Sequence, residues 1–154
     1  MPRDVRELIL QRLKAILEGI DGVETTWRDR EDVKPEQTPT LILLDGSESK
    51  RTATAGSGHT RMPPAIMEMT PQIWVQLTPR ADAGNAGVGE ELSAWRAKIL
   101  SAIFKDAQLA ALQGENGELE YRGTRTDMEY GSIMLGNEIF ELTLTYLFDP
   151  DDLA

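Results

Sequence analysis

The sequence predicts an α+β domain, with a largely antiparallel sheet and two main helices packed on one face. Residues 4–18 and 90–105 place apolar side chains at helical spacing, and several other stretches alternate between apolar and polar side chains. These elements follow one another as helix, strands, helix, strands, without an apparent internal repeat. A chain of 154 residues is long enough for one core, so we expect a single domain over residues 1–154.

The first helix is predicted over residues 4–18, with Gly19 where the chain leaves it. Its apolar positions recur at helical spacing: Val5, Leu8, Ile9, Leu13, Ile16, Leu17 and Ile20. Short strands are then expected at residues 23–28 and 40–44, and Asp45-Gly46 favours a turn after the second of them.

A long loop between strands is predicted over residues 47–64. Its glycines and small polar residues bury little apolar surface, so we expect this loop to be mobile in the free subunit. Lys50, Arg51 and Arg61 give it a local positive excess in an otherwise acidic chain. That excess favours contact with the acidic surface of a neighbouring protein.

The clearest strand is predicted over residues 65–78. Its expected buried face consists of Met67, Met69, Pro71, Ile73, Val75 and Leu77. Trp74 and Ile66 lie on the opposite, mostly polar face, which predicts that part of this face meets a partner surface or a covering segment. Pro71 lacks an amide hydrogen and therefore favours an edge strand, a bulge or a break into two strands.

A second connection is expected over residues 79–89, followed by the helix at 90–105 with Glu90 and Glu91 in its first turn. Its apolar stripe is Leu92, Trp95, Ile99, Leu100, Ile103 and Phe104. A short helical turn is expected between Asp106 and Gly114, and strands at residues 119–128 and 137–148. The predicted core packs Ile73, Val75, Leu77, Leu142 and Leu144 against Leu8, Leu13, Ile99 and Ile103.

Composition excludes several classes of function. The formal net charge of −10 repels nucleic-acid phosphates, so tight DNA binding is not expected. The chain has no cysteine, and its single histidine, His59, lies in a Gly/Ser/Thr stretch without nearby partner ligands. No segment is long and apolar enough to span a bilayer, and no secretion signal is recognisable. We therefore expect a soluble protein with no catalytic residues, cofactor or metal site.

The order of segments, together with the C-terminal stretch GNEIFELTLTYLFDP (136–150), resembles the tail-terminator and tail-completion proteins of long-tailed, siphovirus-type bacteriophages. Those proteins begin with a helix and continue with strands that a long loop interrupts. A second helix and a final strand of this kind complete them. The likeness covers nearly the whole chain.

This resemblance implies a structural virion protein, assembled in the host cytoplasm, that forms a hexameric ring. Such a ring caps the tail tube protein, ends tail polymerisation and provides the surface for the head-tail connector or neck protein. DNA would pass through it without specific binding, which is compatible with an acidic channel. We expect the interface to include Lys50, Arg51, Arg61, Ile66 and Trp74. Two alternatives stay open: a neighbouring head-tail connector protein, or a small ligand-binding or enzymatic α+β domain.

Overall fold

The computed structural model describes residues 3–29, 39–53, 62–77, 84–115, 117–129 and 135–153. Five strands form one sheet in the order β1 (Thr25–Arg28), β2 (Thr40–Ala53), β3 (Ala65–Leu77), β5 (Leu135–Phe148) and β4 (Leu119–Glu129). β1 is parallel to β2, and the other neighbours are antiparallel. The helices α1 (Val5–Glu18), α2 (Gly84–Phe104) and α3 (Ala107–Gln113) complete the fold, which confirms the α+β class. A 3-10 turn, η2 (Pro150–Leu153), follows β5.

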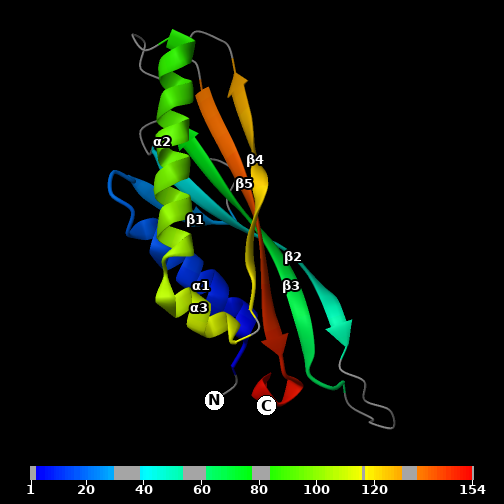
Figure 1. Ribbon diagram of the computed structural model, residues 1–154. Coiled ribbons are helices and arrows are strands. Elements are labelled where there is room, and N and C mark those ends of the chain that lie inside the picture. Colours follow the sequence, from blue (N-terminus) through cyan, green and yellow to red (C-terminus); the bar gives the residue numbers. More distant parts are fainter. Residues whose placement is uncertain are drawn as a thin grey trace.

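Figure 1 shows the three helices beside one another on one side of a twisted sheet, while the lower ends of β2 and β3 extend past them. Buried side chains from all three helices and from alternate strand positions form a single cluster. The strands contribute Leu41, Leu43, Met69, Ile73, Val75, Leu77, Phe140, Leu142, Leu144 and Tyr146 to it. We call the sheet face that carries these residues the inner face, and the opposite one the outer face.

The helices depart from the sequence prediction of the core at three positions. Leu8 is only half-buried and lies outside the cluster, whereas Leu10, which the predicted stripe omits, is fully buried. α3 packs against α1 and widens the surface that α1 must bury. At the end of α2, Phe104 is 50 % exposed although it belongs to the predicted apolar stripe.

Local capping explains where two helices begin and end. The Asp4 carboxylate accepts a hydrogen bond from the Glu7 amide at 3.3 Å, and Gly19 ends α1. The Asp106 carboxylate accepts one from the Leu109 amide at 2.8 Å, and Gly114, with a φ of +87°, ends α3. Both helices are confirmed close to their predicted bounds.

The connection predicted over residues 79–89 is wrong from Gly84 onward. α2 begins at Gly84, so Glu90 and Glu91 lie beyond its first turn and do not cap its positive end. The glycines at 84, 87 and 89 lower the helix propensity of this segment. Extending an existing helix still gains one backbone hydrogen bond for each residue added, which offsets that cost and explains the earlier start of α2. Residues 79–83 lie outside the described part of the chain.

The loop predicted over residues 47–64 is wrong at its start. β2 continues to Ala53, and residues 47–53 pair with residues 65–70 of β3. Residues 47–53 are mostly polar, so they do not show the apolar alternation by which a strand is predicted. They still form a strand, because the hydrogen bonds of the ladder come from the backbone and not from apolar side chains. Residues 54–61, which include Arg61 and His59, lie outside the described residues, so the predicted mobility remains a prediction there.

Pro71 lies in β3, which has β2 on one side and β5 on the other, so the edge-strand interpretation is wrong. The register between β2 and β3 shifts at Asp45 and Gly46, opposite the proline. Gly46 has a φ of +68°, a left-handed conformation that favours glycine. A bulge in β2 thus accommodates the missing amide hydrogen, and the bulge interpretation is confirmed.

Candidate subunit interface

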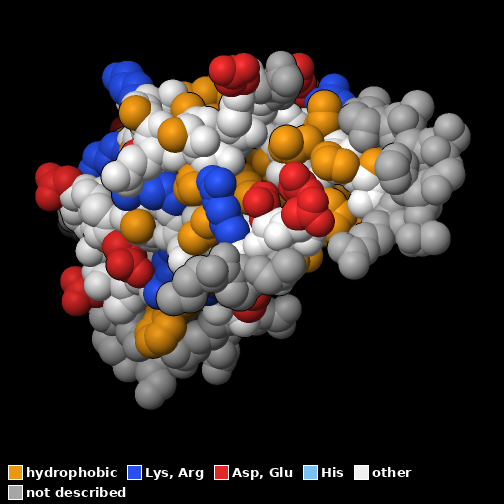
Figure 2. Space-filling model, turned by 90° about the horizontal axis from the view of Figure 1, so that it is seen from below, with side chains coloured by type: hydrophobic (Ala, Val, Ile, Leu, Met, Phe, Trp, Pro, Cys, Tyr) orange, Lys and Arg blue, Asp and Glu red, His pale blue; other side chains and the backbone are white. Residues whose placement is uncertain are grey.

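The lower end of the outer face carries an apolar pair. Ile66 on β3 lies opposite Leu147 on β5. Leu147 is 53 % exposed, and Met62, which precedes β3, is 43 % exposed. Figure 2 views this end of the molecule from below and shows hydrophobic side chains next to acidic ones. Large apolar side chains that gather on a surface are typical of contact sites.

Two of the predicted cationic residues, Arg51 and Lys50, lie on different faces of the sheet. Arg51 lies on the outer face, where its Nη1 donates to Glu118 at 3.0 Å and its Nε lies 3.9 Å from Glu68. Lys50 is level with Met67, whose side chain packs against the inner cluster. A register shift at residue 51 separates the two neighbours. Arg51 and Ile66 therefore share the outer face, and Lys50 does not.

Trp74 occupies the upper part of the outer face. It lies between Ile42 of β2 and Ile139 of β5, and both isoleucines are buried. Trp74 itself is half-buried, and its indole Nε1 is buried without a hydrogen-bond partner in the described part of the chain. Its contribution to the free subunit is to cover these isoleucines, so it offers a partner less surface than Leu147 does.

A polar hollow of about 300 Å³ lies between these two regions of the outer face. Its charged lining residues are Glu68, Arg122 and Glu141, and Gln72 donates a hydrogen bond to Glu141 at 3.2 Å. The hollow lies beside the interruption of β3 at Thr70 and Pro71. It brings carboxylates, one guanidinium and the hydroxyl groups of Thr70 and Thr143 together, and the Thr70 hydroxyl is hydrogen-bonded to that of Ser47 at 2.9 Å.

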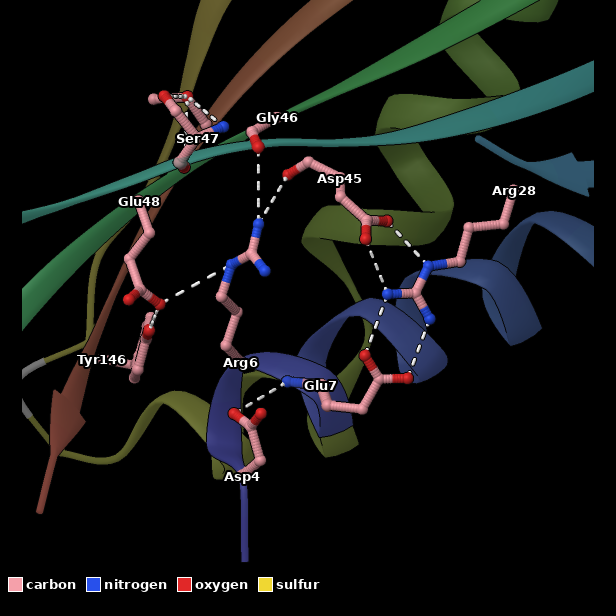
Figure 3. Close-up of polar contacts among 10 residues, drawn as sticks. Asp4, Arg6, Glu7, Arg28, Asp45, Gly46, Ser47, Glu48 and Tyr146 are labelled. Carbon is pink, nitrogen blue, oxygen red and sulfur yellow. Dashed lines mark hydrogen bonds and ion pairs between the residues drawn. The ribbon is translucent and has the colours of Figure 1, made fainter. Parts of the chain in front are cut away.

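The densest ionic cluster of the described residues lies between α1, β1 and β2 (Figure 3). Arg28 donates to both oxygens of Glu7, at 2.8 and 2.9 Å, and to both oxygens of Asp45, at 2.7 and 2.8 Å. These hydrogen bonds hold the pKa of Glu7 and of Asp45 below their usual values and raise the pKa of Arg28. The cluster fixes α1 to the start of the bulge.

Arg6 extends this cluster to the bulge itself. Its Nη2 donates to the carbonyl oxygens of Asp45 and Gly46 at 3.5 and 3.4 Å, and its Nε lies 3.6 Å from Glu48. Glu48 in turn accepts a hydrogen bond from the Tyr146 hydroxyl (Figure 3). Burial, followed by this hydrogen bond, raises the pKa of Tyr146 and keeps the phenol neutral. Every acid of the cluster is therefore committed to a neighbour, which indicates a structural role.

Glu138 is the most buried carboxylate among the described residues, with 4 % exposure. Its Oε1 accepts a hydrogen bond from the Thr124 hydroxyl at 3.2 Å, and its Oε2 has no partner in the described part of the chain. Burial raises the pKa of Glu138, partly offset by that hydrogen bond and by the charge of Arg96. One raised pKa without a second reacting group does not make a catalytic site.

The described residues therefore offer contact surfaces more clearly than chemistry. They contain no group of three or more His, Cys, Asp or Glu side chains placed to hold a metal ion. None of the described helices combines the length and the apolar character needed to cross a bilayer. The sequence alone could not reveal the exposed Leu147 beside Ile66, because that proximity depends on the pairing of β3 with β5. No protein-family model matches the chain, and no curated protein is similar to it in sequence.

Proposed function

We propose that this protein is a structural subunit that assembles into a closed ring through the lower end of its sheet. The observation that carries the proposal is the exposed Leu147 beside the half-buried Ile66 on the outer face. An apolar contact of this kind is removed from water when copies associate. The acidic chain keeps single subunits soluble before they assemble.

The resemblance to tail-terminator and tail-completion proteins gives the ring its role. On this proposal a hexamer caps the tail tube of a long-tailed bacteriophage, stops its polymerisation and presents a surface to the head-tail connector. The protein then belongs to the virion and needs no active site or cofactor. Its net charge of −10 is compatible with a channel that releases passing DNA.

Mass photometry of the purified chain over a range of concentrations, followed by negative-stain imaging, tests the proposal. We expect a discrete oligomer with an annular shape. Leu147→Asp should shift the population toward the monomer, because it places a charge in the apolar contact. Leu147→Met preserves an apolar side chain and serves as the matched control. A wild-type chain that stays monomeric at every concentration contradicts the proposal.

The polar hollow supports a second candidate, a small ligand-binding domain. Its arginine and two carboxylates are suited to a small polar molecule that carries both an acidic and a basic group. Arg122→Ala would then abolish binding of such a molecule without changing the oligomeric state. The apolar pair has no function on this alternative, which is why we favour the ring.

A further inference from the structure

A groove of about 540 Å³ lies between α1 and α2, on the helical side of the molecule. It exists because small residues stand where the helices approach each other: Ala15, Gly19, Ser101 and Ala102. Ile16 and Ile20 also line it, each with less than a tenth of its surface exposed. The floor of the groove is therefore partly apolar.

Positive charge borders this groove. Lys98 and Lys105 of the α2 end face it, together with Arg12, Asp21 and Asp106. Arg12 and Asp106 neutralise each other, because the two side chains form two hydrogen bonds, at 2.9 and 2.5 Å. Lys98 donates to the backbone carbonyl oxygen of Asp21 at 3.4 Å, which leaves its positive charge unpaired by this contact. The charges of Lys98 and Lys105 therefore face only one remaining carboxylate of the lining, that of Asp21. The groove is thus locally basic on a chain with a net charge of −10.

The 3-10 turn η2 has the opposite character. Asp149 precedes it, Asp151 and Asp152 lie in it, and Leu153 at its end is 46 % exposed. The turn is preorganised, since the Asp149 carboxylate accepts from the Asp151 amide at 3.0 Å and the Arg3 amide donates to the Asp152 carbonyl at 2.5 Å. Even with the charge of Arg3 beside it, three carboxylates leave the turn acidic. It directly continues the strand that carries Leu147.

We propose that the acidic turn η2 of one copy docks in the α1/α2 groove of the next copy, with Leu153 above Ile16 and Ile20 and the carboxylates beside Lys98 and Lys105. The turn cannot reach the groove of its own chain. Its tether at Arg3 lies before α1, and residues 5 to 16 of a helix span about 16 Å. The contact therefore joins two different surfaces of two copies, an arrangement that forms a ring when the rotation between copies closes and a filament when it does not. This inference rests on the proposed self-assembly and adds to it the groove that would receive the lower end of the next copy, where η2 follows the strand of Leu147.

Two charge-reversal variants test the docking. The groove variant carries Lys98→Glu with Lys105→Glu, and the turn variant carries Asp151→Lys with Asp152→Lys. Each alone sets like charges against each other, so we expect its assembly midpoint to rise at least about a hundredfold. An equimolar mixture should assemble again, because every groove then meets a turn of opposite charge when the two chains alternate. Combining all four substitutions in one chain should also restore assembly.

The controls separate docking from folding and from net charge. Circular dichroism melts should show that both variants fold, since Lys98, Lys105 and Asp151 are exposed and Asp152 is half-buried. The groove variant should melt slightly below the wild type, because Lys98 also donates to the Asp21 carbonyl oxygen and lies 4.8 Å from the centre of the Trp95 ring. Arg122→Glu with Arg125→Glu changes the charge of β4 by the same amount as the groove variant and should assemble normally. Leu153→Ser should weaken assembly without any change of charge.

Three results would overturn the docking. They are a groove variant that assembles like the wild type, a mixture that stays unassembled, and a β4 control that fails as badly as the groove variant. If the wild type forms rings in any of these cases, the proposed function stands and only the choice of surfaces is wrong. A wild type that never assembles removes both.

Discussion

Gly46→Ala probes the bulge that lets a proline lie in the middle of the sheet. Gly46 adopts a φ of +68°, which costs an alanine backbone energy. A Cβ at this position would also overlap the carbonyl group of Thr70 on the neighbouring strand. The overlapped carbon and oxygen of Thr70 are backbone atoms, so they cannot move aside as the end of a flexible side chain would.

The expected cost combines these two effects. The left-handed conformation contributes about 2 kcal/mol, and the steric overlap adds about 2 kcal/mol. A total of about 4 kcal/mol should lower the melting temperature of a chain of this length by roughly 8–16 °C.

Gly123→Ala separates the two effects. Gly123 also lies at a register shift, between β4 and β5, and has a φ of +131°, but a Cβ there meets nothing within 4 Å. Only the backbone cost of about 2 kcal/mol should remain. Urea denaturation followed by circular dichroism gives both free energies of unfolding. If Gly46→Ala costs no more than Gly123→Ala, the close approach at Thr70 does not constrain the sheet.

Three further predictions concern the core, the ion pairs of Arg28 and the buried Glu138. Leu144→Ala should cost about 2–5 kcal/mol in urea denaturation because it opens a cavity in the inner cluster, and Leu8→Ala, at a half-buried position, should cost clearly less; equal costs would remove the core assignment. Arg28→Met should lower the melting temperature most near neutral pH, because the two carboxylates whose pKa it lowers contribute stability above their unfolded pKa values of about 4.5 and 3.8. That deficit should shrink as those carboxylates protonate in acid, and a constant deficit from pH 7 to pH 3 would argue against the ion pairs. Glu138→Gln should raise the melting temperature at neutral pH, because burial penalises the charged carboxylate and raises its pKa, and the gain should vanish below the unfolded pKa near 4.5; a loss at neutral pH would show that the charge is stabilising.

The parts of the fold that could be predicted are those whose signal lies within one segment. The alternation of β3 from Ala65 to Leu77 indicates its buried face directly, and the caps at Asp4 and Asp106 indicate where two helices begin. The second half of β2 has no comparable pattern in its sequence. Its residues pair through their backbones, and Asp45-Gly46 has the composition of a turn although it forms a bulge.

The candidate interface could be predicted only in part, for a related reason. Ile66 is conspicuous because it interrupts a polar face in its own strand. The exposure of Leu147 and the division of Lys50 and Arg51 between two faces depend on strand pairing and on a register shift. The clusters around Arg28 and Arg6 join residues up to 98 positions apart along the chain, and no pattern within a segment contains that information.

The interruption at Pro71 has a mechanical consequence for the sheet. Pairing between β3 and β5 stops after Met69 and resumes at Gln72, and the bulge in β2 lies opposite the same point. The hydrogen-bond ladders are thereby divided into an upper and a lower block, and the lower ends of β2 and β3 extend past the helices (Figure 1). The ladder is weakest at this point, while Met69, Leu144 and Tyr146 of the lower block stay packed in the same buried cluster as the upper block. Amide protons beside the interruption should exchange with solvent faster than those of either block. In the assembly that we propose, only the strand ends beyond the buried cluster, where Ile66 and Leu147 lie, can adjust to a neighbouring copy while the domain stays folded.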